Sequence, residues 1–153
     1  MISISQRLIS LFMYMLPWSS ALTYGNNIFN NYPILKLLIL PTWPIFFIIQ
    51  SIPFGDFIFF LFLFLGIARN QNIPYFIRLN TMQSILLHLI IVIFNYFDIL
   101  LSRLYIDIFI IESLETIIFI STLTIIIFAS IQTLRGIETN IPGISDSAKM
   151  QIS

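Results

Sequence analysis

The chain has no cysteine and few charged side chains, and each shortage excludes a class of function. Without cysteine it has no disulfides, no thiolate metal sites and no cysteine nucleophile. Its single histidine cannot form a histidine-rich metal site, so we expect no metal and no other cofactor. Charged residues make up 9% of the 153 residues, whereas a soluble domain carries about 25%. The chain is therefore too poor in charge for an ordinary water-soluble domain.

The charges that are present favour neither nucleic-acid binding nor catalysis. Seven basic and seven acidic side chains cancel, and the basic ones form no cluster that could follow phosphates. No serine or threonine stands at a recognisable spacing from a base, and there is no glycine-rich phosphate loop or cluster of metal ligands. We therefore expect neither a nucleic-acid partner nor an enzyme.

The sequence is rich in long hydrophobic segments. Hydrophobic residues make up 58% of the chain and the mean hydropathy is +0.97. At about 20 apolar residues per helical span, the chain has room for four or five crossings of a bilayer and for no soluble domain. Residues 1–153 are therefore expected to form one integral membrane domain of the all-α class, a polytopic helical bundle.

The charged residues mark the limits of the predicted spans, because each charge costs about 2.5 to 3.5 kcal/mol at the centre of a membrane helix. Four stretches are predicted to cross: 8–24, 53–68, 79–101 and 116–134. Pro17 predicts a kink in the first of them. The asparagine-rich stretch at 25–32 predicts a loop, and the polar tail at 137–153 is expected to be irregular.

The segment 33–52 is long and apolar, but prolines interrupt it. Pro41 and Pro44 remove two backbone donors near its middle. We expect two short helices that lie shallow in the membrane or enter and leave it on one side. A full crossing remains the alternative, since neighbouring helices sometimes repair such a break.

Orientation follows from the basic residues that flank the spans. With four crossings, five of the seven basic residues share one side: Arg7, Arg69, Arg78, Arg135 and Lys149. If 33–52 also crosses, Lys36 and Arg7 exchange sides and the split is again five to two. The C-terminus is predicted to face the inside in both cases, and only the side of the N-terminus depends on the prolines.

The third predicted span carries a polar stripe. When each residue is advanced by about 100° around a helix, six polar side chains share one narrow arc. They are Asn80, Ser84, His88, Asn95, Asp98 and Ser102. Such a stripe must face protein or water, because polar groups are costly in hydrocarbon. Two interpretations stay open, hydrogen bonding between helices and lining of an aqueous path, and His88 is also a candidate for proton relay.

Several short segments together resemble a known family. They are Ile52–Phe54, Leu65–Asn70, the run Arg-x-Asn-x-Met-Gln at Arg78, Asn80, Met82 and Gln83, and Ile141–Ala148. In this combination the chain is similar to the twenty-kilodalton subunit family of the chloroplast inner-envelope protein translocon (Tic complex), including its plastid-encoded algal members. The resemblance extends over nearly the whole chain.

The resemblance implies a four-helix protein of the plastid inner envelope membrane with both termini toward the stroma. It implies a role in preprotein import, in which the chain forms or supports the preprotein-conducting path together with other translocon subunits and membrane lipid. A small-solute transporter and a scaffold subunit of a membrane complex are the alternatives. A transporter is expected to show internal repeats, and the sequence has none.

Overall fold

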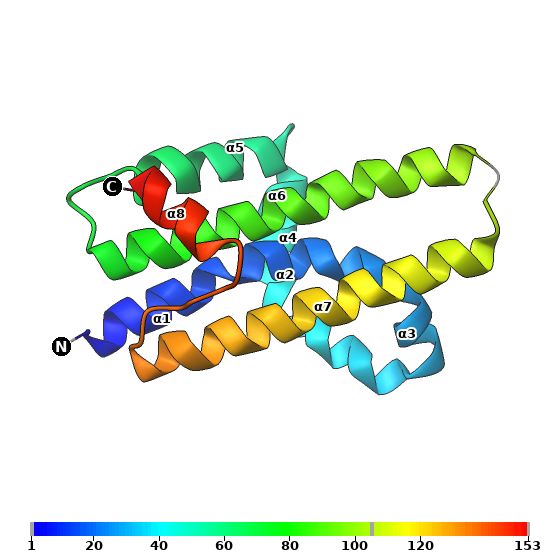
Figure 1. Ribbon diagram of the computed structural model, residues 1–153, viewed down its shortest axis with the longest axis horizontal. Coiled ribbons are helices and arrows are strands. Elements are labelled where there is room, and N and C mark those ends of the chain that lie inside the picture. Colours follow the sequence, from blue (N-terminus) through cyan, green and yellow to red (C-terminus); the bar gives the residue numbers. More distant parts are fainter. Residues whose placement is uncertain (1, 105, 153) are drawn as a thin grey trace.

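Two long helices dominate the structure, a computed structural model that describes residues 2–104 and 106–152, apart from the side chain at position 50. Helix α6 (Tyr75–Arg103) and helix α7 (Ile108–Arg135) run antiparallel (Figure 1). Both are long and apolar enough to cross a membrane. The described residues contain no strand, which confirms the all-α class. The ends of the predicted domain, Met1 and Ser153, lie outside the described residues.

The predicted spans 79–101 and 116–134 fall inside α6 and α7, and the local sequence explains where α7 begins and ends. The carboxylate of Asp107 accepts a hydrogen bond from the Phe109 N–H at 2.9 Å, which caps the start of the helix. Gly136 follows the last turn with φ +70°, the left-handed conformation that glycine adopts most readily. The helix therefore ends at Arg135, one residue beyond the predicted limit of the span at 134.

The first predicted span forms two helices, α1 (Ile4–Met13) and α2 (Met15–Ala21), which are separated at Tyr14. Pro17 has no N–H, so the carbonyl oxygen of Met13, four residues earlier, loses its helical partner. The interruption therefore lies about one turn before the proline. Both helices pack against α6 and α7.

The stretch predicted as a loop after the first span is helical instead. A 3-10 helix, η1 (Leu22–Gly25), leads directly into the short helix α3 (Asn26–Asn31). The side-chain amides of Asn26 and Asn31 each donate to a backbone carbonyl of the preceding turn at 3.0 Å. The high asparagine content of this stretch predicted a loop, but the asparagine side chains stabilise helical turns through these hydrogen bonds.

The proline-rich segment consists of the 3-10 helix η2 (Pro33–Thr42) and helix α4 (Trp43–Ser51), so the chain is interrupted where the prolines lie. Helix α5 (Gly55–Leu61) follows and continues into a π-helix, η3 (Phe62–Ala68). These apolar helices are shorter than α6 and α7, which in the described part of the chain are the two with the length of a membrane crossing.

The C-terminal tail is not irregular throughout. Helix α8 (Ser145–Ile152) lies across the start of α6 (Figure 1). Ile141, Ile144, Ala148 and Ile152 are spaced three or four residues apart, and all four are buried. The prediction was wrong here because it weighed the average polarity of the tail and missed this apolar periodicity.

Side chains from most elements form two core clusters, and α6 contributes to both. In one cluster the ring of Phe119 on α7 contacts the rings of Trp18 and Phe29, with centroid distances of 6.4 and 5.5 Å. In the other, Leu79 and Ile85 of α6 pack with residues of α2, α4, η3 and α8. Helix α6 is thus the central helix of the bundle.

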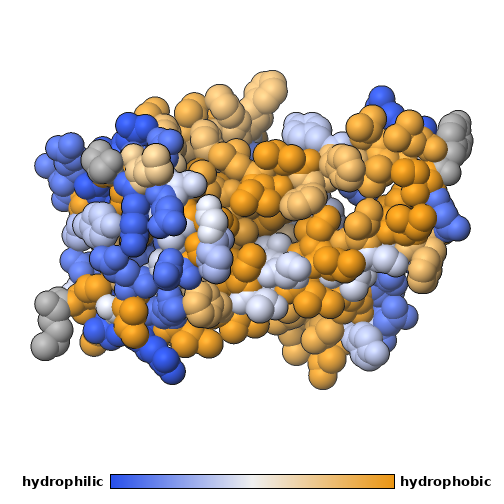
Figure 2. All heavy atoms as spheres, in the orientation of Figure 1, coloured by the Kyte–Doolittle hydropathy of each residue, from blue (hydrophilic) through white to orange (hydrophobic). Residues whose placement is uncertain are grey.

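The outer surface is apolar around the middle of the bundle. Figure 2 shows hydrophobic side chains over the central zone and hydrophilic ones gathered toward the two ends of the long axis. Large apolar side chains such as Trp43 and Ile93 are 68% and 66% exposed. A surface of this kind suits lipid, because a soluble monomer rarely exposes such extensive apolar patches.

Candidate functional site

The six residues of the predicted stripe occupy two environments along α6. Asn80, Ser84 and His88 are buried, Asp98 is half-buried, and Asn95 and Ser102 are exposed. The apolar side of the same helix faces outward, since Leu89, Ile93 and Phe97 are all exposed. The stripe therefore faces the bundle at the start of α6 and leaves it toward the end.

At the start of α6 the Asn80 side chain joins four parts of the chain. Its Oδ1 accepts hydrogen bonds from the hydroxyls of Thr133 at 3.0 Å and Thr139 at 2.9 Å. The Tyr14 hydroxyl lies 3.0 Å from the same oxygen and 2.9 Å from Gln83 Oε1, and it has one proton to donate. Residues between α1 and α2, on α6, on α7 and in the tail thus meet at one buried amide.

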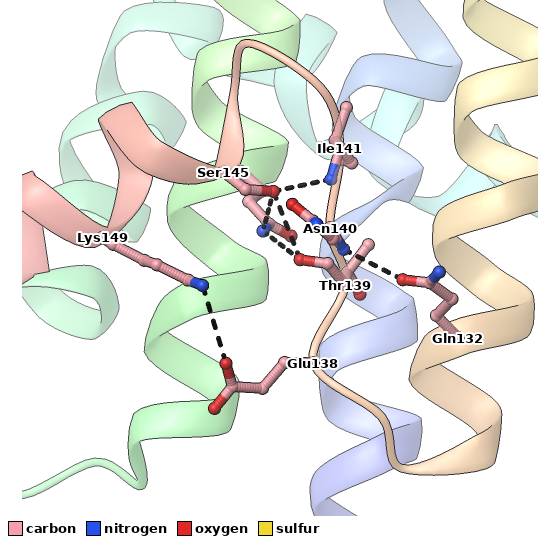
Figure 3. A network of polar contacts seen from close by, with 8 residues as sticks. Gln132, Glu138, Thr139, Asn140, Ile141, Ser145 and Lys149 are labelled. Carbon is pink, nitrogen blue, oxygen red and sulfur yellow. Dashed lines mark hydrogen bonds and ion pairs between the residues drawn. The ribbon is translucent and has the colours of Figure 1, made fainter.

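Gln83 attaches the tail to α6. Its Nε2 donates to the Thr139 carbonyl at 2.8 Å and to Ser145 Oγ at 3.0 Å. Ser145 Oγ in turn accepts from the Ile141 N–H at 2.6 Å, which fixes the turn before α8 (Figure 3). Farther out, Gln132 Oε1 accepts from the Asn140 N–H at 2.9 Å. The tail is held by its backbone groups and by the buried hydroxyls of Thr139 and Ser145, so its position depends little on its exposed side chains.

The other motif residues of α6 contact the same end of the chain. The Arg78 guanidinium donates from Nε to the Ala68 carbonyl at 3.1 Å and from Nη2 to the carbonyl of Ile152. Met82 is buried in the core cluster that contains Ala148 and Ile152. The Arg-x-Asn-x-Met-Gln run and the Ile141–Ala148 segment, found separately in the sequence, thus lie against each other.

Ser84 repairs the break that Pro17 makes. Its hydroxyl donates to the Met13 carbonyl oxygen at 2.5 Å, the oxygen that the missing proline N–H leaves without a helical donor. A buried carbonyl without a partner is costly in a membrane, where water cannot replace the donor. Ser84 is thus a structural contact between α6 and the α1–α2 break.

Beyond Ser84 the stripe borders an open cavity of about 430 Å³, here called the α6 cavity. Its polar lining is Ser19, Ser20, Thr23, Asp56, His88 and Asn95, and its apolar lining comes from α4 and α6. His88 is 4% exposed, and its Nδ1 lies 2.9 Å from Ser20 Oγ. Sequence reasoning found His88 and Asn95, but it treated Asp56 only as the start of the second span.

A tight turn brings Asp56 to this cavity. Gly55 is buried, and a Cβ on it would lie 1.9 Å from the carbonyl oxygen of Ile49, so only glycine lets α5 pass this close to α4. Phe54, just before it, has the left-handed φ of 57°. The chain can therefore fold back within three residues. As a result, the Asp56 carboxylate in the first turn of α5 lines the α6 cavity together with side chains of α2 and α6.

Charges divide unequally between the two ends of the bundle. At the end that holds the N-terminus, the 69–74 connection and α8, here called the tail end, Arg7 donates to the Leu134 carbonyl at 3.1 Å and Arg69 to Gln151 Oε1 at 3.1 Å (Figure 1). Five basic and two acidic residues belong to this end: Arg7, Arg69, Arg78, Arg135, Lys149, Glu138 and Asp146. The rest of the molecule carries the reverse, two basic and five acidic residues. Arg7 thus lies at the same end of the bundle as the tail.

Sequence reasoning missed four members of the Asn80 network: Tyr14, Thr133, Thr139 and Ser145. Thr133 lies within the predicted span 116–134, and Ser145 lies in the motif segment Ile141–Ala148, but neither has a local signal that indicates its partner. Nothing local marks Tyr14. No group of three or more possible metal ligands occurs within the described residues, so the cavity has no set of side chains for a metal ion.

An apolar outer surface, polar ends and a buried polar network define an integral membrane protein of the helical-bundle class. Within that class, the chain belongs to the family described as "Chloroplast import apparatus Tic20-like", whose profile matches residues 4–148. The resemblance predicted from the sequence motifs is confirmed.

Three relatives show the extent of the similarity. A Tic20 family protein of Synechocystis sp. is 31% identical over 150 residues, which cover 95% of this chain and 92% of that protein. Protein TIC 20-v, chloroplastic, of Arabidopsis thaliana is 28% identical over 153 residues, covering 97% and 71%. Protein TIC 20-II, chloroplastic, of the same plant is 35% identical over 100 residues, covering 65% and 46%. The family match over residues 4–148 includes both motif segments.

Proposed function

We propose that this chain is a membrane subunit of the plastid inner-envelope import translocon and that its α6 cavity borders the path of the preprotein. Family membership supports the role in import. The α6 cavity is the observation that supports the position of the preprotein path. A polar recess is exceptional in a bundle whose outer surface is apolar. A small helical bundle fills its own core, so other translocon subunits or further copies complete the wall. The chain acts without a catalytic step or a cofactor.

The proposed topology is a single domain over 1–153 with four crossings at 8–24, 53–68, 79–101 and 116–134. The segment 33–52 enters and leaves on the side opposite the tail. The contact between Arg7 and Leu134 supports an even number of crossings, because it joins the start of the first predicted span to the end of the last. The basic tail end supports an orientation with both termini in the stroma.

Single introduced cysteines test this topology cleanly, because the chain has none. In sealed inner envelopes, an impermeant thiol reagent added from the intermembrane side should label a cysteine at Asn26. It should leave cysteines at Ser3, Asn72 and Ser147 unmodified until the membrane is opened. Labelling at Ser3 alone among these three would show five crossings, and labelling at Ser147 would reverse the orientation.

The stripe is proposed to serve two purposes. Asn80 and Ser84 pack helices together, and their hydrogen bonds to the Thr133 hydroxyl and the Met13 carbonyl support this role. His88, Asn95 and Asp98 belong to the path, with Ser102 at its outer end. His88 acts there as a hydrogen-bonding group, because its Nδ1 is engaged by Ser20.

Site-specific crosslinking to an arrested preprotein tests the path. A cysteine at Asn95 should crosslink to the preprotein. A cysteine at Ser84, about three turns away on the same stripe, should not, because position 84 is buried in a helix contact. A cysteine at Ile93 on the exposed apolar face is the second negative control.

Three other outcomes have definite meanings. Crosslinks from Asn95 only to other translocon subunits would make the chain a scaffold beside the path. Crosslinks from Ile93 to the preprotein would place the path on the lipid-facing side and overturn the assignment. Intact import after chemical blocking of the Asn95 cysteine, with uptake of a small solute lost, would favour the small-solute transporter.

A further inference from the structure

The α6 cavity contains hydrogen-bond acceptors that the chain itself does not use. Among the described residues, the Asp56 carboxylate forms no ion pair or hydrogen bond, and the Asn95 side chain forms no hydrogen bond. His88 is buried, and its Nδ1 is engaged by Ser20, while its Nε2 has no hydrogen-bond partner in the described part of the chain. The Ser20 hydroxyl also lies 3.4 Å from the Leu16 carbonyl. If it donates there, Nδ1 carries the proton and Nε2 is an acceptor.

The walls of the cavity have the opposite character. Ile49 of α4 and Ile91, Val92 and Ile99 of α6 line it, and none of the described residues that line it is lysine or arginine. Its volume of about 430 Å³ lies within the range of about 300–1,000 Å³ typical of ligand sites. Apolar walls beside the Asp56 carboxylate and the Asn95 side-chain oxygen fit a cationic group on an aliphatic stem, because the stem packs on the walls while the cation meets the oxygen acceptors. The absence of a basic lining residue disfavours a phosphate group.

We propose that the α6 cavity binds an arginine or lysine side chain of an incoming presequence, with the Asp56 carboxylate as its ion-pair partner and Asn95 and His88 as further acceptors. This inference rests on the proposed import function and names the feature of the preprotein that the site recognises. Chloroplast presequences are rich in arginine and serine and poor in acidic residues. Five of the seven acidic side chains lie outside the tail end, so the local field attracts such a segment.

The binding test uses the full-length chain in nanodiscs of zwitterionic lipid and a fluorescent synthetic peptide that is amphipathic and rich in arginine and serine. Anisotropy titrations give the Kd. Asp56→Asn should weaken binding about tenfold, because it removes the charge from a charge-assisted hydrogen bond. A peptide with glutamine in place of every arginine should bind weakly to both forms and should not distinguish them. Asp56→Glu keeps the charge and should bind within about threefold of the unmodified chain.

Asp107→Asn is the matched control. It removes the same charge outside the cavity, and the new side chain can still accept from the Phe109 N–H that caps α7. Its effect on the Kd should stay within about twofold. Equal weakening by Asp56→Asn and Asp107→Asn would show a general field instead of a site and would overturn the proposal. So would an unchanged Kd for Asp56→Asn.

The two proposals fail in different ways. If Asn95 crosslinks to the arrested preprotein but Asp56→Asn leaves the peptide Kd unchanged, the path stands and the recognition of basic side chains is wrong. If Asp56→Asn weakens peptide binding but Asn95 does not crosslink, the cavity binds basic side chains and does not border the path. Asn95→Leu gives a second variant for the peptide assay, and a Kd equal to that of the unmodified chain would remove Asn95 from the site.

Discussion

The two halves of α6 present polar side chains in opposite states. Near its start, Asn80 and Gln83 are buried and their amides are engaged by hydroxyls and by the backbone of the tail. Near its end, Asn95 faces an open cavity without a hydrogen bond to the described residues. Buried polar groups without partners are strongly destabilising, so the hydrogen bonds of Asn80 and Gln83 stabilise the fold. We call this first half of α6 the joint, because it holds α7 and the tail in place. The second half keeps polar groups that are free to bind, and it is the half for which we propose the aqueous path.

The largest effect is expected at the joint. Asn80→Ala removes the acceptor for the Thr133 and Thr139 hydroxyls and leaves them buried, so we expect a loss of about 3–5 kcal/mol in the free energy of unfolding. Thermal unfolding of the purified chain in detergent, followed by circular dichroism, measures it. The matched control is Asn95→Ala on the same helix, which should change stability by no more than about 0.5 kcal/mol. Equal effects at the two asparagines would remove the contrast between the halves.

Gly55→Ala should give the second-largest loss of stability, and it should also change the α6 cavity. The new Cβ would lie 1.9 Å from the Ile49 carbonyl oxygen, so the α4–α5 turn must shift, at a cost of about 2–3 kcal/mol. Loss of labelling at an Asn95 cysteine would report the change in the cavity. Gly66→Ala is the control, because its Cβ meets nothing closer than 3.7 Å. A stable Gly55→Ala variant with an unchanged labelling rate would contradict the account of the turn.

Ser84 should give an intermediate effect with a specific rescue. Ser84→Ala leaves the Met13 carbonyl without a donor and should destabilise the chain by about 1–2 kcal/mol. In a Pro17→Ala background the new N–H at position 17 can take that carbonyl, so the same substitution should cost less. The double-mutant cycle in unfolding free energy tests this coupling. Additive effects would show that Ser84 does not serve the break made by Pro17.

The smallest effect is expected at the exposed side of the tail. Lys149 Nζ and Glu138 Oε2 are 3.9 Å apart, and their side chains are 44% and 53% exposed (Figure 3). Lys149→Ala should therefore stay within about 0.5 kcal/mol of the unmodified chain. Gln83→Ala, which removes the buried attachment of the same tail, should cost several times more. A large effect at Lys149 would mean that surface charge, and not Gln83, holds the tail.

The sequence predicted the two long helices and the proline interruption because these depend on neighbouring residues. It failed at α3 and α8, where short polar segments become helical through local asparagine bonds and through burial of Ile144 and Ile152 against the bundle. It also identified Asn80 and Gln83 as a motif without finding their partners. Those partners lie 53 to 66 residues away for Asn80 and cannot be found by spacing.

By itself, the sequence determined that the protein lies in a membrane, that it is helical, and to which family it belongs. Hydrophobic segments, charge positions and short motifs are local properties of the chain, so they can be identified without the fold. Only the tertiary structure shows that Arg7 contacts the end of α7, which members of the α6 stripe have hydrogen-bond partners, and that Asp56 and His88 line one cavity. The physical reason is that a hydrogen bond or an open recess depends on distances between helices. Helical periodicity predicts which face of a helix a side chain occupies, but it does not predict which hydrogen-bond partner the side chain contacts.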